Sequence, residues 1–104
     1  LLKAGAMVNL SDKGGYTALM QAAGNNHPQS VETLLEAGAD PDRVEDTQGW
    51  SALIWAAKQG FERPVEILLR HGANPVIRDD RQMTAADWAR QEGHLSTLQL
   101  FGEG

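Results

Sequence analysis

The stretch "GGYTALMQAAGNNH", residues 14–27, decides the fold because the chain repeats it. A second version, "QGWSALIWAAKQGF", spans residues 48–61, and a third, "QMTAADWARQEGH", spans residues 82–94. Thr17, Ser51 and Thr84 occupy the same place in the three copies, at offsets of 34 and 33 residues. Self-similarity at such a period is the signature of a repeat protein, in which stacked copies of one small unit share a core.

Each unit is predicted to hold two helices joined by a turn. The hydroxyl residues Thr17, Ser51 and Thr84 precede alanine-rich apolar stretches, where such side chains cap the free N–H groups of a helix. An asparagine or glycine then marks the end of this inner helix, because both residues tolerate a left-handed backbone. The outer helix follows, with apolar residues at the i, i+3, i+4 spacing of a buried stripe. These stripes are Val31, Leu34 and Leu35, and Val65, Leu68 and Leu69.

The units resemble ankyrin repeats, whose pattern runs Asp-x-x-Gly-x-Thr-Pro-Leu-His-x-Ala-Ala, then Gly-His, then Val, Leu-Leu and Gly-Ala-Asp. Here it reads "DKGGYTALMQAAGNNH…SVETLLEAGAD" and "DTQGWSALIWAAKQGF…PVEILLRHGAN", and the match covers nearly the whole chain. The resemblance implies an all-α fold, an ankyrin-repeat solenoid of helix-turn-helix units joined by β-hairpin-like loops. Met20, Ile54 and Asp87 replace the family's histidine, so its usual hydrogen bonds to the loop should be missing.

One ankyrin-like domain is expected over residues 1–104. Its predicted parts are the end of a truncated repeat (1–11), two repeats (12–45 and 46–78) and a C-terminal capping repeat (79–104), which is degenerate and more polar. The offset of 34 residues places one extra residue in the loop that runs from Asp40 to Gly49, and we expect this loop to bulge at its tip.

Composition excludes several classes of function. The net charge is -5, from 9 Lys and Arg against 14 Asp and Glu, which argues against nucleic-acid binding. No apolar run approaches the roughly 20 residues of a membrane helix, so we expect no membrane insertion. The absence of cysteine fits an intracellular location, in the cytoplasm or the nucleus.

No catalytic, cofactor or metal site is predicted. The three histidines fall in separate repeats, and no motif links Ser, His and Asp into a catalytic triad. The acidic stretch "DPDRVED", residues 40–46, lacks the glycine of a calcium loop and is expected to be a solvated loop. We therefore predict that the protein is not an enzyme and binds neither a cofactor nor a metal.

The resemblance implies that the variable residues of the loop tips and inner helices line a concave face. All three tryptophans and the single tyrosine fall at such positions, and these residue types are frequent binding hot spots. The predicted partner-binding residues are Tyr16, Gln21, Trp50, Trp55, Lys58, Arg81, Met83 and Trp88.

The spacing of the tryptophans predicts that the three indoles meet. Trp50 lies five residues before Trp55, and Trp88 occupies the position of Trp55 one repeat along. Trp55 and Trp88 have an alternative role as packing between neighbouring inner helices, whereas Trp50, at the base of a loop, is expected outside the core. Lys58 stands one turn after Trp55, where it would repel a cationic guest.

The favoured function is a non-catalytic protein–protein interaction module, acting as a monomer, that binds a protein or peptide partner. Two alternatives remain open. One is a reader of a peptide containing lysine or methyl-lysine, which would use the tryptophan cluster as some ankyrin repeats of histone methyltransferases do. The other is a structural spacer that holds flanking domains apart.

Overall fold

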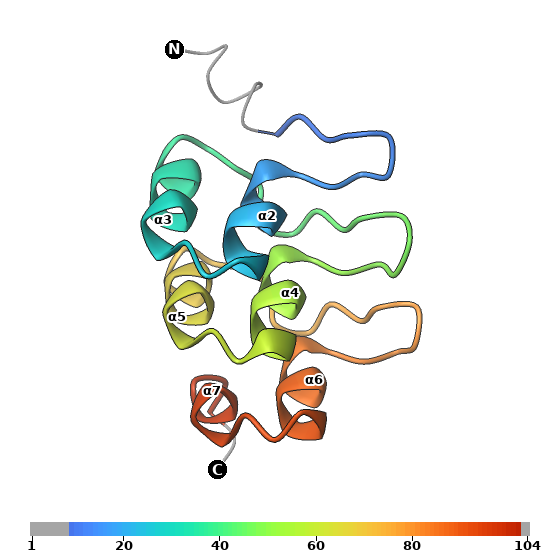
Figure 1. Ribbon diagram of the computed structural model, residues 1–104, viewed down its shortest axis with the longest axis vertical. Coiled ribbons are helices and arrows are strands. Elements are labelled where there is room, and N and C mark those ends of the chain that lie inside the picture. Colours follow the sequence, from blue (N-terminus) through green and yellow to red (C-terminus); the bar gives the residue numbers. More distant parts are fainter. Residues whose placement is uncertain (1–8, 103–104) are drawn as a thin grey trace.

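A computed structural model describes residues 9–102 of the protein. Within this range, three pairs of antiparallel helices stack along the long axis, and three extended loops project from the same side of the stack (Figure 1). The inner row next to the loops consists of α2 (Ala18–Gly24), α4 (Ala52–Gln59) and α6 (Ala85–Gln91). The outer row consists of α3 (Pro28–Glu36), α5 (Glu62–Arg70) and α7 (Leu95–Gln99). The fold is all-α, as predicted.

Inner helices begin at the predicted caps. The side-chain oxygens of Thr17, Ser51 and Thr84 accept from the backbone N–H three residues later, at 3.2, 3.3 and 3.2 Å. Asp87, in the position of the family's histidine, accepts from the Thr84 N–H at 3.0 Å, and the Met20 sulfur accepts more weakly from Thr17 at 3.4 Å. In the first and third copies, the side chains of Met20 and Asp87 therefore accept a hydrogen bond from the N–H of the capping residue in place of the family's histidine.

The core lies between the helix rows and continues from one repeat to the next. Leu19 and Leu53 of the inner helices are fully buried, as are Val31, Val65 and Leu68 of the outer helices. The predicted outer stripes are confirmed only in part, since Leu34 and Leu69 are half-buried against this core. Stacking on the neighbouring pair explains the deep burial in α4 and α5.

Each loop is held by an acidic side chain at its first turn position. Oδ1 of Asp12 accepts from the N–H groups of Gly14 and Tyr16 at 2.9 and 3.0 Å. Asp79 does the same for Arg81 and Met83, both at 2.9 Å. A short polar side chain that bonds to the following backbone stabilises a turn.

The second loop carries its extra residue at the tip, as predicted. The Glu45 N–H donates to the carbonyl of Trp50, five residues on, whereas the Asp12 N–H donates to Tyr16, four residues on. The longer Glu45 side chain spans the wider turn, and its Oε1 accepts from Thr47 and Gln48 at 2.7 and 2.8 Å.

The expectation of a solvated acidic stretch is wrong for Glu45. Its side chain is only 4% exposed, because it folds beneath the loop to reach the backbone N–H groups of its own turn. Asp40, Asp42 and Asp46 are not buried, as expected of a solvated loop.

Neighbouring loops are joined through their backbones. The Asp46 N–H donates to the carbonyl of Gly14 at 2.7 Å, and the Asp80 N–H donates to that of Gln48 at 3.0 Å. Extended pairing within residues 9–102 is limited to one antiparallel bridge, between Ser11 and Thr17. The loops therefore form a hydrogen-bonded row that runs beside the inner helices (Figure 1).

The described part of the chain holds neither a membrane-spanning helix nor a metal cluster. Among residues 9–102, no helix is long and apolar enough to cross a membrane. In the same range, no group of three or more His, Asp or Glu side chains is arranged for a metal ion.

Candidate partner-binding site

Four aromatic side chains form a continuous row between the loops and the inner helices. We name Tyr16, Trp55, Trp50 and Trp88 the aromatic row. Ring centroids along it are 5.7, 4.7 and 5.4 Å apart, and every contact is edge to face. Such geometry is favourable for aromatic pairs. The prediction that the three indoles meet is confirmed, with Trp50 between the other two.

Asp79 fixes one end of the aromatic row. Its Oδ2 accepts from Nε1 of Trp50 at 2.8 Å and from Nε1 of Trp88 at 2.7 Å. Its Oδ1 is already taken by two backbone N–H groups of the third loop. One carboxylate thus ties the second loop, the third loop and α6 together.

The pKa of Asp79 is lowered by this arrangement. Burial raises the pKa, but hydrogen bonds from the Met83 N–H, the two indoles and the Arg81 N–H favour the charged form and outweigh it. The carboxylate remains ionised although it is only 3% exposed.

The expectation that Trp50 lies outside the core is wrong. Trp50 is 6% exposed and Trp88 is 4% exposed. Asp79, from the following repeat, satisfies both indole N–H groups and lets the rings pack inward. For Trp88 the packing alternative is correct, whereas Trp55 stays half-buried and keeps a surface available to a partner.

A pocket of about 430 Å³ lies beside Trp50 and Trp88. The ammonium of Lys58 stands 5.5 Å from the centroid of the Trp88 ring, within the range of a cation–π contact. Arg81 lines the same pocket from the third loop. The protein's own cation therefore occupies the aromatic surface that a guest ammonium would need.

A second pocket, of about 320 Å³, lies one repeat upstream, beside Tyr16 and Trp55. It occupies the equivalent place between two loops and an inner helix, and Glu45 replaces Asp79 in its wall. The pKa of Tyr16 is raised, first by burial and then by the charges of Asp12 and Glu45. The charged side chains that line this pocket, those of Asp12 and Glu45, are therefore acidic.

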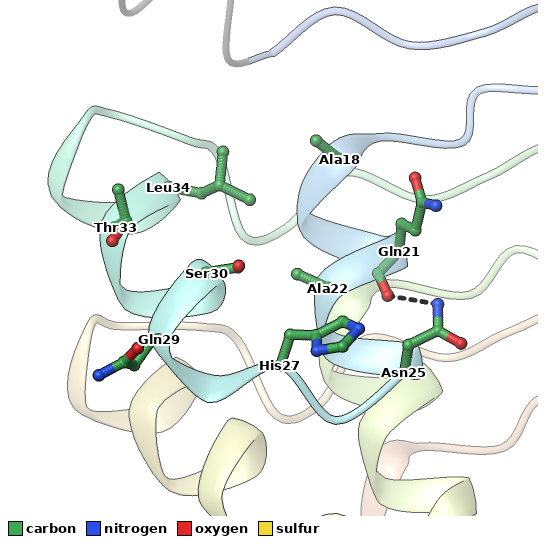
Figure 2. A pocket seen from close by; sticks show the side chains of 9 residues that line it. All are labelled: Ala18, Gln21, Ala22, Asn25, His27, Gln29, Ser30, Thr33 and Leu34. Atoms are coloured by element: carbon green, nitrogen blue, oxygen red, sulfur yellow. Dashed lines mark hydrogen bonds between the residues drawn. The ribbon is translucent and has the colours of Figure 1, made fainter.

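Gln21 lies apart from the aromatic row, on α2, where it lines a pocket of about 580 Å³ between α2 and α3. Figure 2 shows Leu34 of α3 facing Ala18 and Ala22 of α2 across this pocket. Ala18 is exposed here, although its counterparts Ala52 and Ala85 are buried by a preceding helix pair. The surface thus corresponds to the stacking face that the other pairs bury.

The remaining predicted site residues lie on the third loop. Arg81 is exposed at its tip, and Met83 at its base is half-buried against the core. The structure therefore brings Tyr16, Trp50, Trp55, Lys58 and Trp88 together along one line and leaves Gln21 at the upstream edge.

Comparison with known proteins supports the repeat assignment. Residues 19–69 match the family model described as ankyrin repeats (many copies). The chain contains ankyrin repeats. A stretch of 46 residues is 50% identical to proteins named mitochondrial disaggregase from Bos taurus and Homo sapiens. It covers 44% of this chain but only 7% and 6% of those two proteins, so the chain spans a small fraction of their length.

Ankyrin repeats are generally protein–protein interaction modules and typically carry no catalytic activity. The aromatic row and its surroundings fit a role in protein binding, since they offer aromatic surface, exposed loop tips and pockets between the loops. The histidines His27, His71 and His94 lie at the ends of different helices and do not converge.

Sequence reasoning missed Asp79 and underestimated Glu45. A signal was present, since an acidic residue stands at the same place in all three ankyrin loops, as Asp12, Glu45 and Asp79. That pattern indicates that the carboxylate accepts hydrogen bonds from the backbone of its own turn. It gives no sign that the second oxygen of Asp79 would bind two indoles that lie 29 and 9 residues away.

Proposed function

We propose that the protein is a non-catalytic interaction module that binds a protein or peptide partner along the surface between the loop tips and the inner helices. The observation that carries this proposal is the aromatic row, whose half-buried members Tyr16 and Trp55 line a pocket. Rigid aromatic side chains supply contact area at little entropic cost, and interfaces are enriched in them. The general role of ankyrin repeats supports the same conclusion.

Net charge and composition restrict the class of partner that the protein can bind. The net charge of -5 favours neutral or basic proteins over nucleic acid. We propose that the module acts as a monomer in an intracellular compartment, which the absence of cysteine fits.

A photo-crosslinking experiment tests the proposed face. The photoreactive residue p-benzoylphenylalanine replaces one residue at a time, at Gln21, Thr47 or Arg81 on the proposed face and at Glu36 or Arg63 on the outer helices, all of which are exposed. Crosslinks to a common partner should form from the loop and inner-helix positions. Equal crosslinking from Glu36 and Arg63 would contradict the proposal.

The two alternative functions have less support. Trp50 and Trp88 are buried and Lys58 lies over Trp88, which leaves little room for a lysine or methyl-lysine side chain between Trp50 and Trp88. Peptides that differ only in lysine methylation, titrated against tryptophan fluorescence, test that function directly. A structural spacer has no need of aromatic side chains aligned from repeat to repeat.

A further inference from the structure

The upstream pocket has acidic and aromatic walls. Its lining consists of Asp12, Gly14, Tyr16, Glu45, Thr47, Gln48 and Trp55. Two of these residues carry carboxylates, and among the described residues that line the pocket there is no lysine, arginine or histidine. The downstream pocket differs, because Lys58 and Arg81 line it together with the carboxylates of Asp79, Asp80 and Glu92.

One oxygen of Glu45 lacks the partners that its counterpart has. Oε1 accepts from two backbone N–H groups, but Oε2 is buried and accepts no hydrogen bond. In the downstream repeat, Oδ2 of Asp79 accepts from two indoles. A buried carboxylate oxygen without a donor is costly, and the charge on Glu45 is left less compensated than that on Asp79.

Trp55, which lines the same pocket, carries a second unsatisfied group. Its Nε1 is buried and makes no hydrogen bond, whereas the aligned Trp88 donates to Asp79. The indole ring is held from both sides, by edge-to-face contacts with Tyr16 at 5.7 Å and with Trp50 at 4.7 Å. The aromatic wall is thus rigid, while one polar atom in it has no partner.

These features match a cation. An ammonium or guanidinium group is attracted to the face of an aromatic ring. The carboxylates of Asp12 and Glu45 add an attraction, and no cationic side chain is among the residues that line the pocket. The size, about 320 Å³, is ample for one long side chain.

We propose that the pocket formed by Tyr16, Trp55, Glu45 and Asp12 binds one basic side chain, arginine or lysine, of a protein partner. The inference rests on the proposed function and gives the chemistry of one contact within it. The downstream pocket beside Trp88 should bind such a side chain less well, because Lys58 already lies over the Trp88 ring and, with Arg81, offsets much of the charge of the carboxylates of Asp79, Asp80 and Glu92.

Nuclear magnetic resonance separates the two pockets, because the three indole N–H groups give three separate signals. The probes are capped tripeptides of the form Gly-X-Gly, in which X is arginine, lysine, norleucine or glutamate. With X as arginine or lysine, the Trp55 indole signal should shift saturably, and the effect should weaken as salt is raised. The indole signals of Trp50 and Trp88, both bonded to Asp79, should move little. Norleucine and glutamate peptides should leave the Trp55 signal in place.

Matched variants test the role of charge. Glu45→Gln keeps an oxygen for the two loop N–H groups but removes the charge, and it should weaken binding of the arginine peptide about three- to fivefold. Asp46→Asn removes the same charge from the adjacent, exposed residue and should leave binding nearly unchanged. Circular dichroism and thermal melting verify that both variants are folded.

The outcomes distinguish this inference from the proposed function. No shift of the Trp55 signal with either basic peptide, or an equal shift with norleucine, overturns the basic-side-chain proposal and assigns the pocket to water. Equal weakening by Glu45→Gln and Asp46→Asn would also overturn it. Crosslinking to a partner from Thr47 and Arg81 would still support the interaction module in each case.

Discussion

At the scale of single residues, the acidic side chain at the start of each loop decides what its neighbours do. Asp79 binds two backbone N–H groups with one oxygen and two indoles with the other, and so it buries Trp50 and Trp88. Glu45 performs only the first of these tasks. Equivalent positions in two repeats therefore give a closed aromatic junction in one case and an open acidic pocket in the other.

Replacement of Asp79 by asparagine should destabilise the protein by about 3 kcal/mol. The amide keeps one oxygen for the backbone N–H groups, but its NH₂ group then faces the two indole N–H donors and cannot accept from them. Hydrogen bonds to a charged group contribute about 1.5 to 3 kcal/mol each, so the loss of these two bonds is costly. Urea unfolding measures the change. Asp80→Asn is the control, since Asp80 is exposed and its variant should lie within about 0.5 kcal/mol of the parent. A stable Asp79→Asn protein would show that the indole bonds contribute little.

Stability should fall in acid because two carboxylates have lowered pKa values. One is Asp79, and the other is Asp87, whose pKa is lowered chiefly by the hydrogen bond from the Thr84 N–H, against the raising effect of burial. A group with a lowered folded pKa stabilises the protein fully above its unfolded pKa, about 3.9, and this contribution is lost as the pH falls from there through the folded pKa.

Urea unfolding between pH 7 and pH 3 measures this dependence. The free energy of unfolding should decrease below about pH 4, and the decrease should be shallower in Asp79→Asn, which has one fewer proton to bind. Parallel curves for the parent and the variant would contradict the assignment of the lowered pKa to Asp79.

At the scale of helices and loops, local sequence predicted much of the structure. The helices begin where expected, at the caps Thr17, Ser51 and Thr84. This could be predicted because a capping side chain bonds to the backbone N–H only three residues later in the sequence. The extra residue lies at the tip of the second loop for the same local reason. The burial of Trp50 was not predicted, because it depends on Asp79 of the following repeat.

The turn at Gly60, between α4 and α5, also depends on a residue that is distant in the sequence, His94. Gly60 ends α4 with a φ of 77°, and a Cβ at this position would lie 2.6 Å from Nδ1 of His94. The His94 ring is held in place by a contact of 3.0 Å between its Nε2 and the carbonyl oxygen of Lys58. Gly93 has almost the same φ, 78°, but a Cβ added there would meet no neighbouring atom within 4 Å.

The pair Gly60→Ala and Gly93→Ala separates these two effects. Both variants carry the cost of a left-handed alanine, about 1 to 2 kcal/mol, but only Gly60→Ala must also displace His94. Gly60→Ala should therefore be the more destabilising in thermal unfolding. In the background of His94→Ala the two substitutions should cost nearly the same, and a persisting difference would mean that the ring is not the obstacle.

At the scale of the whole molecule, the described helices differ in how many neighbouring helices they pack against. Among the described residues, the central helix α4 makes its main contacts with α2, α5 and α6, whereas the short α7 makes its main contacts with α6 and α5. In repeat proteins stability is close to a sum of unit and interface terms, so units with fewer neighbours open more readily.

Hydrogen exchange should therefore proceed unevenly along the chain. We expect the amides of α4 to be the most protected and those of α7 to exchange faster, with a difference of about tenfold or more. Mass spectrometry of peptides covering the two helices measures this. Equal protection in α4 and α7 would show that the stack opens as one cooperative unit.

The aromatic row also makes the protein its own optical reporter. Its four rings are all the tryptophan and tyrosine that the chain contains, and they alternate between a loop, α4, the next loop and α6. Rings at centroid distances of 4.7 to 5.7 Å have coupled electronic transitions. The tryptophan and tyrosine bands of the near-ultraviolet circular dichroism spectrum will thus report how the loops pack on the inner helices, whereas Phe61 and Phe101 contribute weaker bands at shorter wavelength.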